Sequence, residues 1–551
     1  MSGLVSTATS ALSSASVYGT LLRAAEEYEA APFLHIPAQH GNEALTLAYG
    51  DIAREVERMR VVLANLGVAR GQRVALLLGN RPEFFIHWFA LNGLGASIVP
   101  LSAEHSAAEM RFVLEDSCAS LIVALPGRSA DLAEVARMLS IPVFWHGEQP
   151  ACEVASHGAA TDGQECALVY TSGSTGVPKG CMLSNDYMRT MGDWYLNMGG
   201  LCALEPGRER LLTPLPLVHM NALAVSTSAM LRSGGCVIQL DRFHPRSFWE
   251  TVRDSGATIV HYLGVMPAIL LQLPVAEAER AHRVKFGFGA GVHPKHHAAF
   301  ESRFGFPLIE SWSMTEVGAG ASVVASVEPR HVGTRCFGRA SADFEYRVVA
   351  DDGTDVTDGQ PGELLVRRAG ADPRKGFFSG YAGLSDLTEE AWAGGYFHTG
   401  DVVRVGPDGS FHFVDRKKSV IRRSGENISS LEVEAVLNQL PMVKEVGVTP
   451  VEDELRGEEV MACVVLPSGH SPTQEAAMAL FDAARERLAY YKLPGYVAFL
   501  PELPLTASNK LQRGALRAAA ERAVSEGSAF DLRTEKKRPV QENHGQERHP
   551  R

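Results

Sequence analysis

Short apolar segments alternate with longer amphipathic segments over residues 50–150. A run of roughly four to eight apolar residues favours a buried strand, whereas longer segments with a helical period favour helices. Alternation of the two predicts a parallel sheet with helices on both faces. The expected strands are 74–78, 97–101, 121–124 and 142–145, and the expected helices are 82–94, 107–116 and 131–139.

A similar alternation returns over residues 190–310, and the pattern then changes twice. Short alternating strands, expected at 344–349 and 362–367, indicate a more antiparallel region. Past residue 415 we expect a small α+β unit, with helices at 430–440 and 473–488 and strands at 443–448 and 460–466. The predicted class is therefore α/β: a large N-terminal domain of doubly wound sheets plus a small β region, followed by a small α+β C-terminal domain.

Composition divides the chain into four segments. Residues 1–16 are rich in Ser and Ala, lack the basic start and apolar centre of a signal peptide, and are expected to be flexible. Residues 17–416 form the expected large domain and 417–527 the small one, with the junction near 415–419, where three basic residues interrupt apolar neighbours. Residues 528–551 carry mixed charge and little to bury, so we expect a disordered tail.

Charge and cysteine content exclude several classes of function. The 551 residues are 45% hydrophobic, which is enough for more than one core. A formal charge of −12 and a pI near 5.9 argue against a nucleic-acid-binding protein or one held on an anionic membrane by charge. The eight cysteines contain no C-x-x-C pair, which favours reduced thiols in the cytoplasm. No apolar run reaches the length that an integral membrane segment needs.

The most informative motif is Tyr-Thr-Ser-Gly-Ser-Thr-Gly-Val-Pro-Lys-Gly at residues 170–180. Its glycines allow successive backbone N–H groups to point at one anion, while the hydroxyl groups and Lys179 add donors and positive charge. The common P-loop would require a glycine at Pro178 when counted from Gly173, so the motif belongs to another class. A Ser/Gly-rich surface loop is the alternative. The apolar run 167–170 before it predicts a buried strand that delivers a phosphate-binding loop.

Four further motifs follow the loop. They are Ser-Trp-Ser-Met-Thr-Glu at 311–316, Phe-His-Thr-Gly-Asp at 397–401, Phe-Val-Asp-Arg-Lys-Lys at 413–418 with Ser-Gly-Glu-Asn-Ile at 424–428, and Pro-Leu-Thr-Ala-Ser-Asn-Lys-Leu-Gln-Arg at 504–513. In this order the set resembles the adenylate-forming superfamily of acyl-CoA synthetases, adenylation domains of peptide synthetases and luciferases. The resemblance covers roughly residues 17–525. Within the superfamily, the sequence looks most like the carnitine/crotonobetaine-CoA ligase and medium-chain acyl-CoA synthetase branch.

The resemblance implies a two-step reaction that uses ATP, Mg²⁺ and coenzyme A. A carboxylate attacks the α-phosphate of ATP and releases pyrophosphate, leaving an acyl-adenylate. The small, mobile domain then moves about its hinge, and the coenzyme A thiol attacks the acyl carbon and expels AMP. Positioning and charge neutralisation carry such a reaction, with no enzyme nucleophile.

Matching positions within the motifs implies roles at the nucleotide. The expected phosphate-binding residues are Thr171, Ser172, Gly173, Ser174, Thr175, Gly176 and Lys179. Thr175 and Glu316 are the expected Mg²⁺ ligands, because hydroxyl and carboxylate oxygens suit that ion. Trp312 is expected to lie flat against the adenine, although a tryptophan here could instead be core. Further nucleotide contacts are expected from Ser313, Met314, Thr315 at the α-phosphate, Asp401 at both ribose hydroxyls, and Arg416 at the ribose.

The resemblance also implies catalytic and hinge residues. Lys510 is expected to bridge the carboxylate and the α-phosphate during adenylation, with Glu316, Thr315 and His219 as the other catalytic residues. Lys418 is the expected hinge, although Lys417 beside it could share that role. The cofactor-binding set is completed by Gly425 and Glu426 and by Gly289, Ala290 and Gly291. A Rossmann interpretation of that last segment fails because Val292 stands where the third glycine would be.

Two departures from the family pattern bear on activity and on the acid. Asn509 replaces a glycine before Lys510, and asparagine tolerates positive φ, so we expect activity to be retained. Ser313 replaces a glycine that leaves room for the acyl chain, which predicts a short, branched or polar acid rather than a long fatty acid. The expected acyl-pocket residues are His219, Tyr262, Met266, Ser313 and Gly318, although a histidine between apolar residues, as His219 is, is often a core residue.

Three functions compete on this sequence. The favoured one is an acid–CoA ligase that needs only small molecules: a carboxylic acid, ATP and coenzyme A. The second is an adenylate-forming enzyme with another acceptor, either a carrier-protein thiol or oxygen. The third is a non-catalytic family member, which the joint presence of Lys510, Asp401, Arg416 and Glu316 disfavours.

Overall fold

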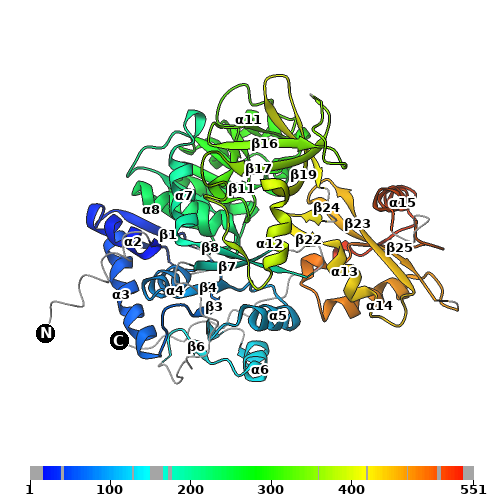
Figure 1. Ribbon diagram of the computed structural model, residues 1–551, viewed down its shortest axis with the longest axis horizontal. Coiled ribbons are helices and arrows are strands. Elements are labelled where there is room, and N and C mark those ends of the chain that lie inside the picture. Colours follow the sequence, from blue (N-terminus) through cyan, green and yellow to red (C-terminus); the bar gives the residue numbers. More distant parts are fainter. Residues whose placement is uncertain are drawn as a thin grey trace.

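The computed structural model describes residues 16–38, 43–126, 129–148, 165–171, 177–357, 359–416, 420–467, 469–504 and 511–537. A large body holds two mainly parallel sheets and a β region, and a smaller C-terminal part lies at one side of it (Figure 1). The predicted α/β class, with a large N-terminal and a small C-terminal domain, is confirmed. Within the described ranges, no helix combines the length and apolarity needed to cross a membrane.

The first sheet has seven strands in the order β18-β8-β7-β4-β3-β5-β6. Its centre matches the predicted alternation, with strands β3 (Arg73–Leu77), β4 (Ser97–Pro100), β5 (Leu121–Ala124) and β6 (Val143–Trp145) and helices α4 (Pro82–Gly93), α5 (Ala107–Ser117) and α6 (Ser129–Leu139). On the other side, β7 (Glu165–Thr171) pairs antiparallel with β8 (Lys179–Ser184), and β18 (Gly380–Tyr381) extends that edge. The two ends of the glycine-rich motif therefore lie on adjacent antiparallel strands.

The second sheet has eight strands in the order β14-β13-β12-β11-β9-β10-β1-β2. Its strands are β1 (Pro32–Ile36), β2 (Leu45–Ala48), β9 (Arg210–Thr213), β10 (Cys236–Gln239), β11 (Ile259–Leu263), β12 (Phe286–Ala290), β13 (Leu308–Trp312) and β14 (Val323–Val324). The associated helices are α7 (Asn185–Leu196), α8 (Thr227–Ser233), α9 (Phe248–Asp254), α10 (Val265–Gln272) and α11 (Pro294–Phe304). Only the two edge pairings, β1 with β2 and β13 with β14, are antiparallel.

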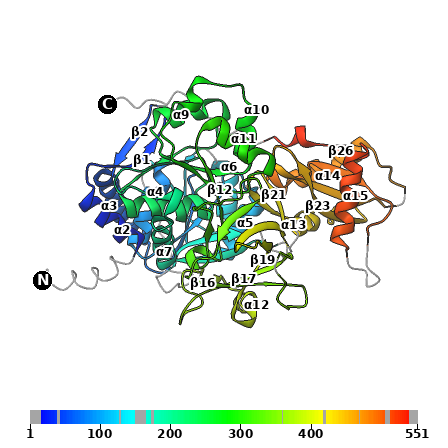
Figure 2. The same ribbon diagram turned by 90° about the horizontal axis from the view of Figure 1, so that it is seen from above.

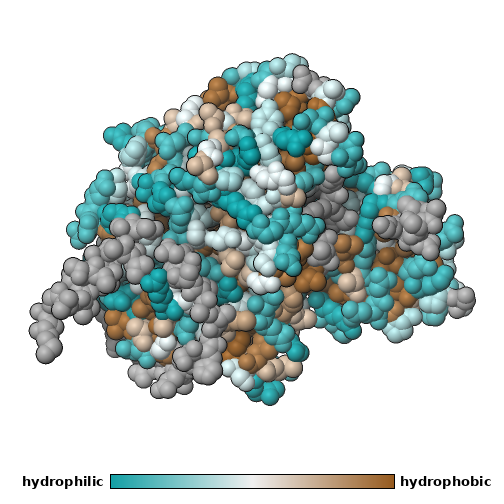
Figure 3. Space-filling model, in the orientation of Figure 1, coloured by the Kyte–Doolittle hydropathy of each residue, from teal (hydrophilic) through white to brown (hydrophobic). Residues whose placement is uncertain are grey.

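Helix α4 explains how the two sheets share one core. Its aromatic residues Phe84, Phe85, Trp88 and Phe89 are all buried, because a helix that is apolar on every side must be enclosed. It packs against α2 (Val17–Glu27) and α3 (Tyr49–Asn65) as well as β4. The main core cluster contains side chains from both sheets, and the visible face of the molecule is mostly hydrophilic (Figure 3).

The predicted antiparallel region is a five-stranded sheet in the order β15-β20-β19-β17-β16. Its strands are β15 (Cys336–Arg339), β16 (Phe344–Val349), β17 (Gly362–Arg368), β19 (Phe397–Val405) and β20 (Ser410–Arg416). Helix α12 (Ser385–Ala391) contacts both β18 and β19. The chain leaves this sheet at Arg416 and enters the C-terminal sheet at Val420, next to the predicted junction.

The C-terminal part has its own six-stranded sheet and its own apolar clusters. Its strands are β21 (Val420–Arg423), β22 (Glu426–Ser429), β23 (Glu445–Asp453), β24 (Gly457–Val465), β25 (Tyr496–Phe499) and β26 (Phe530–Asp531), and its helices are α13 (Ser430–Leu437), α14 (Gln474–Arg485) and α15 (Arg513–Ser525). Figure 2 shows α14, α15 and β26 together at the far end from α2 and α3.

The start of the charged tail departs from the predicted disorder. Strand β26 pairs with β25, and Lys536 is buried with its Nζ 2.6 Å from a Glu459 carboxylate oxygen. Burial lowers the pKa of Lys536 to about 7, even though the Glu459 carboxylate favours its charged form. Composition missed this because the two apolar residues that pack on the C-terminal core here, Phe530 and Leu532, stand among charged residues. Residues 538–551 and 1–15 lie outside the described residues.

Candidate active site

The ends of the glycine-rich motif converge where β7 ends and β8 begins. Thr171 pairs with Lys179 across the two strands. The Lys179 side chain is buried, with its Nζ 4.9 Å from the centre of the Tyr381 ring. Residues Ser172, Gly173, Ser174, Thr175 and Gly176 lie outside the described residues, so their phosphate-binding role stays a prediction.

Glu316 lies next to this pair of strands. Tyr381 donates a hydrogen bond from its hydroxyl to Glu316 Oε1 over 3.0 Å, and Glu316 is 7% exposed. Burial, followed by the Glu316 carboxylate, raises the pKa of Tyr381 well above its ordinary value. Tyr381 therefore contacts both Lys179 and Glu316, and this brings a cation and a carboxylate to the stem of the loop.

Trp312 and Asp401 form the second fixed group. The Trp312 indole Nε1 donates to Asp401 Oδ2 over 2.8 Å, and Asp401 is 2% exposed. The indole also stacks on Phe337, with ring centres 6.0 Å apart. The sequence predicted both residues at the nucleotide but did not reveal this bond. Asp401 is paired in register with Arg416, and the Arg416 side chain is not described.

The motif around Ser313 turns back on itself. Ser313 Oγ lies 2.8 Å from Ser322 Oγ, and both hydroxyls donate to the Gly318 carbonyl oxygen. Gly318 has φ of +51°, and a Cβ there would overlap the Tyr187 ring, so this position requires glycine. The Tyr187 hydroxyl in turn donates to the Thr315 carbonyl oxygen over 3.0 Å. The Ser313 hydroxyl is thus held by its own turn, which the sequence did not indicate.

Glu310 is a site residue that the sequence analysis missed. Its buried carboxylate accepts hydrogen bonds from the backbone N–H groups of Gly291 and Val292 and from the Tyr262 hydroxyl, over 2.9, 3.0 and 3.0 Å. Burial raises its pKa in spite of these donors. It fixes the end of β12, where Gly289, Ala290 and Gly291 are expected to contact the ligand. Its only signal was an acidic residue within the apolar strand 308–312.

Tyr262 and Met266 do not lie beside His219 and Ser313. They line a small internal void together with Phe300 and Phe306, on the face of the sheet covered by α10 and α11. Successive residues of a strand point to opposite faces, and the preceding residue, His261, is the one that contacts α7. The expected role of these two residues in the acyl pocket is a prediction that this placement does not support.

The C-terminal domain contributes a turn to the same region. His219 Nε2 of the large domain lies 3.4 Å from Oε1 of Glu426, the residue of the C-terminal domain at which β22 begins. Gly425 has φ of +92°, and a Cβ there would overlap the Leu263 side chain at the end of β11. Burial alone would lower the pKa of His219, but the Glu426 carboxylate raises it above its ordinary value. Across the domain boundary, Gly425 therefore lies against Leu263 and Glu426 meets His219.

A buried ion triad also joins the two domains, and the sequence analysis missed it. Lys492 of the C-terminal domain places its Nζ 2.6 Å from Glu109 of the large domain and 2.7 Å from Glu432 of its own domain. Burial alone would lower the pKa of Lys492, but Tyr491, Glu109 and Glu432 raise it. Nearby, the Ser106 hydroxyl donates to the Arg487 carbonyl oxygen. Lys417, Lys418 and Lys510 lie outside the described residues.

Comparisons with known proteins identify the family of the chain. The AMP-binding enzyme family matches residues 21–381, and its C-terminal domain matches residues 432–510. A crotonobetaine/carnitine–CoA ligase of Salmonella choleraesuis (strain SC-B67) is 27% identical over 492 residues, which cover 84% of this chain and 92% of that protein.

Solved structures of two proteins are similar to the chain over nearly their whole length. A malonyl-CoA ligase with methylmalonyl-CoA and AMP bound is 27% identical, with a TM-score of 0.71 over 86% of this chain and 96% of its own. The o-succinylbenzoate–CoA synthetase of Bacillus subtilis is 26% identical. Its complex with a product analogue, OSB-NCoA, gives a TM-score of 0.78 over 91% of this chain and 98% of its own. Its complex with the acyl-adenylate gives 0.63 over 90% and 97%. The chain belongs to the AMP-binding enzyme family and is an AMP-forming acid–thiol ligase of the adenylate-forming superfamily.

Proposed function

We propose that the protein is an ATP-dependent acid–CoA ligase acting on a short, branched or polar carboxylic acid. The observation that carries the proposal is the convergence of Lys179, Glu316 and Tyr381 at the stem of the glycine-rich loop. A cation and a carboxylate at that place suit the charged phosphates of ATP and a metal ion bound to them.

The proposed first step forms the acyl-adenylate. A carboxylate oxygen of the acid forms a bond to the α-phosphorus, and the bond to pyrophosphate breaks. Lys179 would place a cation beside the phosphates, Asp401 would accept from the ribose, and Thr315 would reach the α-phosphate. Lys510 would neutralise the charge that develops between the two reactants.

The residues near the loop stem fit a magnesium ion. Glu316 offers a hard carboxylate oxygen, and Thr175 is the second expected ligand. Across the described part of the chain there is no cluster of three His, Cys, Asp or Glu side chains that could hold a metal. Magnesium commonly uses one or two protein ligands with phosphate oxygens and water, so Glu316 suffices. The ion would neutralise phosphate charge when bound.

The proposed second step transfers the acyl group to the coenzyme A thiol. The sulfur forms a bond to the acyl carbon, AMP leaves, and the thiol proton is lost to solvent or a base. Support for this acceptor comes from the placement of Glu426 beside His219 and of Gly425 against Leu263. The chain also has a higher TM-score against the complex with the product analogue OSB-NCoA than against the acyl-adenylate complex. This difference supports a domain arrangement like that of the product-analogue complex.

An assay of AMP and pyrophosphate release tests the proposal. A panel of straight, branched, keto and hydroxy acids would be incubated with ATP and Mg²⁺, with and without coenzyme A, and acyl-CoA measured separately. We expect release on short or polar acids and acyl-CoA only with the thiol. Release without acyl-CoA would indicate another acceptor, and no release on any acid would overturn the proposal.

A further inference from the structure

A network of hydrogen-bonded side chains lies on the side of β11 that faces α7. His261 Nδ1 lies 2.7 Å from Asn221 Oδ1 and 3.0 Å from Ser226 Oγ, and its Nε2 lies 2.8 Å from the Tyr195 hydroxyl. Asn221 and Ser226 are the two ends of a π-helical turn, a rare form that is frequent at functional sites. Phe288 covers the imidazole, with ring centres 4.9 Å apart.

The donors and acceptors in this network can be assigned. The Ser226 hydroxyl donates its single proton to the backbone carbonyl oxygen of Asn221 over 3.1 Å. Ser226 can therefore only accept a hydrogen bond from His261. His261 Nδ1 therefore carries the proton, and Nε2 accepts from Tyr195. Burial lowers the pKa of His261 to about 3, which agrees with a neutral ring.

This assignment also orients the Asn221 carboxamide. Its Oδ1 must face the Nδ1–H of His261, because the flipped amide would oppose two donors. The Nδ2 group then points away with two hydrogens and has no hydrogen-bond partner among the described residues. Asn221 is only partly buried. Its Nδ2 has no hydrogen-bond partner in the described part of the chain and yet is not one of the fully enclosed side-chain atoms in that state, so Nδ2 itself is accessible.

That space lies beside the contact between the two domains. His261 and Leu263 point to the same face of β11, and Leu263 is the residue against Gly425. Two residues along a strand span about 7 Å. Asn221 follows His219, the partner of Glu426, by two positions. Asn221 is therefore set back from the domain contact by a distance that a few bonds of an acyl chain would cover.

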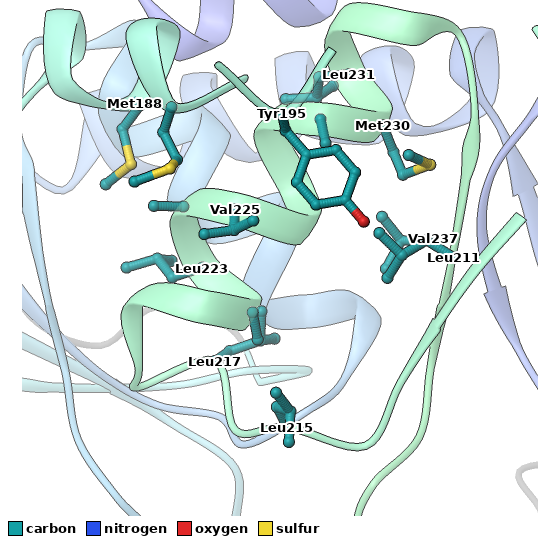
Figure 4. Packing of buried hydrophobic residues seen from close by; sticks show 14 of the residues in the cluster. Met188, Tyr195, Leu211, Leu215, Leu217, Leu223, Val225, Met230, Leu231 and Val237 are labelled. Carbon is teal, nitrogen blue, oxygen red and sulfur yellow. The ribbon is translucent and has the colours of Figure 1, made fainter. Parts of the chain in front are cut away.

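We propose that Asn221 determines substrate specificity by donating a hydrogen bond from Nδ2 to a neutral oxygen, a ketone or a hydroxyl, on the acyl chain a few bonds from the carboxyl. His261 is the positioning residue, because it holds Oδ1 and is itself held by Tyr195. Figure 4 shows Tyr195 among aliphatic side chains such as Leu211, Val225 and Met230, where its hydroxyl can exchange little with water. The inference rests on the proposed function and narrows its acid.

Pairs of acids that differ only by oxygen or methyl test the inference. Suitable pairs are 4-oxopentanoate with 4-methylpentanoate and 5-oxohexanoate with 5-methylhexanoate, compared by kcat/KM for acyl-CoA formation. In the wild type we expect the keto acid of at least one pair to be preferred about tenfold or more, because its analogue leaves a donor unpaired. The ratio within a pair does not depend on how much enzyme is folded.

Variants assign the preference to these residues. Asn221→Asp keeps an oxygen for His261 and removes the donor, and Asn221→Leu removes both; each should bring the ratio to about one or below. His261→Phe should reduce it, and His261→Gln, which can still donate to Oδ1, should restore part of it. Asn197→Leu, at the exposed asparagine that follows the last residue of α7, is the matched control and should leave the ratio unchanged.

Two failures can be told apart. A wild-type ratio at or below one for both pairs, or a ratio that Asn221→Leu leaves unchanged, overturns the role of Asn221 while acyl-CoA formation still supports the ligase. No AMP formation with any acid overturns the proposed function itself.

Discussion

The nucleotide side of the candidate site and the contact between the domains are built differently. On the nucleotide side, Trp312 with Asp401 and Tyr381 with Glu316 form hydrogen bonds of 2.8 and 3.0 Å within the large domain. At the domain contact, the His219 side chain is 43% exposed and the Glu426 side chain 24%, and each group belongs to a different domain. The first arrangement is preorganised, and the second exists only while the domains are in this position.

The difference suits a reaction in two steps. Preorganised donors and acceptors stabilise developing charge without reorganisation, which the first step requires at the phosphates. A contact that depends on domain position can complete the second step and then release. The Lys492 triad belongs to the second kind, because the ion pair of Lys492 with Glu109 joins one domain to the other.

The largest expected effect comes from breaking the preorganised side at Glu316. Glu316→Gln keeps an oxygen that can accept from Tyr381 but removes the charge beside the phosphates. We expect adenylation to fall about 100- to 1,000-fold, measured as pyrophosphate release in the first turnover over a range of Mg²⁺ concentrations. Glu389→Gln, at an exposed carboxylate paired with Arg374, is the control. A loss below tenfold would contradict the role of Glu316.

The next effect comes from breaking the domain contact at Glu109. Glu109→Gln can still accept from the Ser106 backbone N–H and leaves the pair of Lys492 with Glu432 inside one domain. We expect acyl transfer from preformed adenylate to coenzyme A to fall about tenfold, because a buried pair is weakened, while adenylation changes less than about twofold. Glu115→Gln on the same helix, paired with Arg111 at the surface, should change neither. Equal losses in both steps would refute the comparison.

The same comparison shows how far sequence can predict such a site. Motifs contiguous in sequence singled out Glu316, Trp312, Asp401 and Gly425, because each motif carries its own strand or turn; their roles at the nucleotide and at coenzyme A stay predictions. Patterns of apolar residues also located most strands to within a few positions. Contacts between distant residues gave no such signal: Lys492 lies 383 residues from Glu109, and His261 lies 40 from Asn221. Such pairs appear only once the sheets are assembled.

Changing the pH should tune the domain contact without a mutation. Burial would lower the pKa of His219, but the carboxylates of Glu426 and Glu104 outweigh it and raise that pKa. Burial would raise the pKa of Glu426, but His219, Lys492 and His105 outweigh it and lower that pKa. The contact is therefore complete between the ordinary pKa values of the two groups. It weakens as the pH rises through the raised value of His219, and again as the pH falls through the lowered value of Glu426.

The measurement of this pH effect needs a reference, because a rising pH also ionises thiols. We therefore expect the ratio of acyl-transfer rates, wild type to Glu426→Gln, to fall about two- to fourfold as the pH rises above about 6.5, the ordinary histidine value. Adenylation rates should keep a constant ratio over the same range. A transfer ratio that does not vary with pH would show that the pair of His219 and Glu426 contributes nothing to the second step.

The smallest expected effect asks whether the preorganised side also limits the acyl chain. Ser313→Gly removes a side chain whose hydroxyl is already held by Ser322 and Gly318, so the change in free space is one small group. We expect kcat/KM for octanoate relative to butanoate to rise about two- to fivefold, less than the roughly tenfold or more that one methylene group is worth in an apolar pocket, because the side chain that is removed is small and already held by its own turn. Ser322→Ala, which removes only the neighbouring hydroxyl, should change this ratio less. An unchanged chain-length profile in Ser313→Gly would place the limit elsewhere, and the Asn221 side of the pocket would then be the part of the large domain that selects the acid.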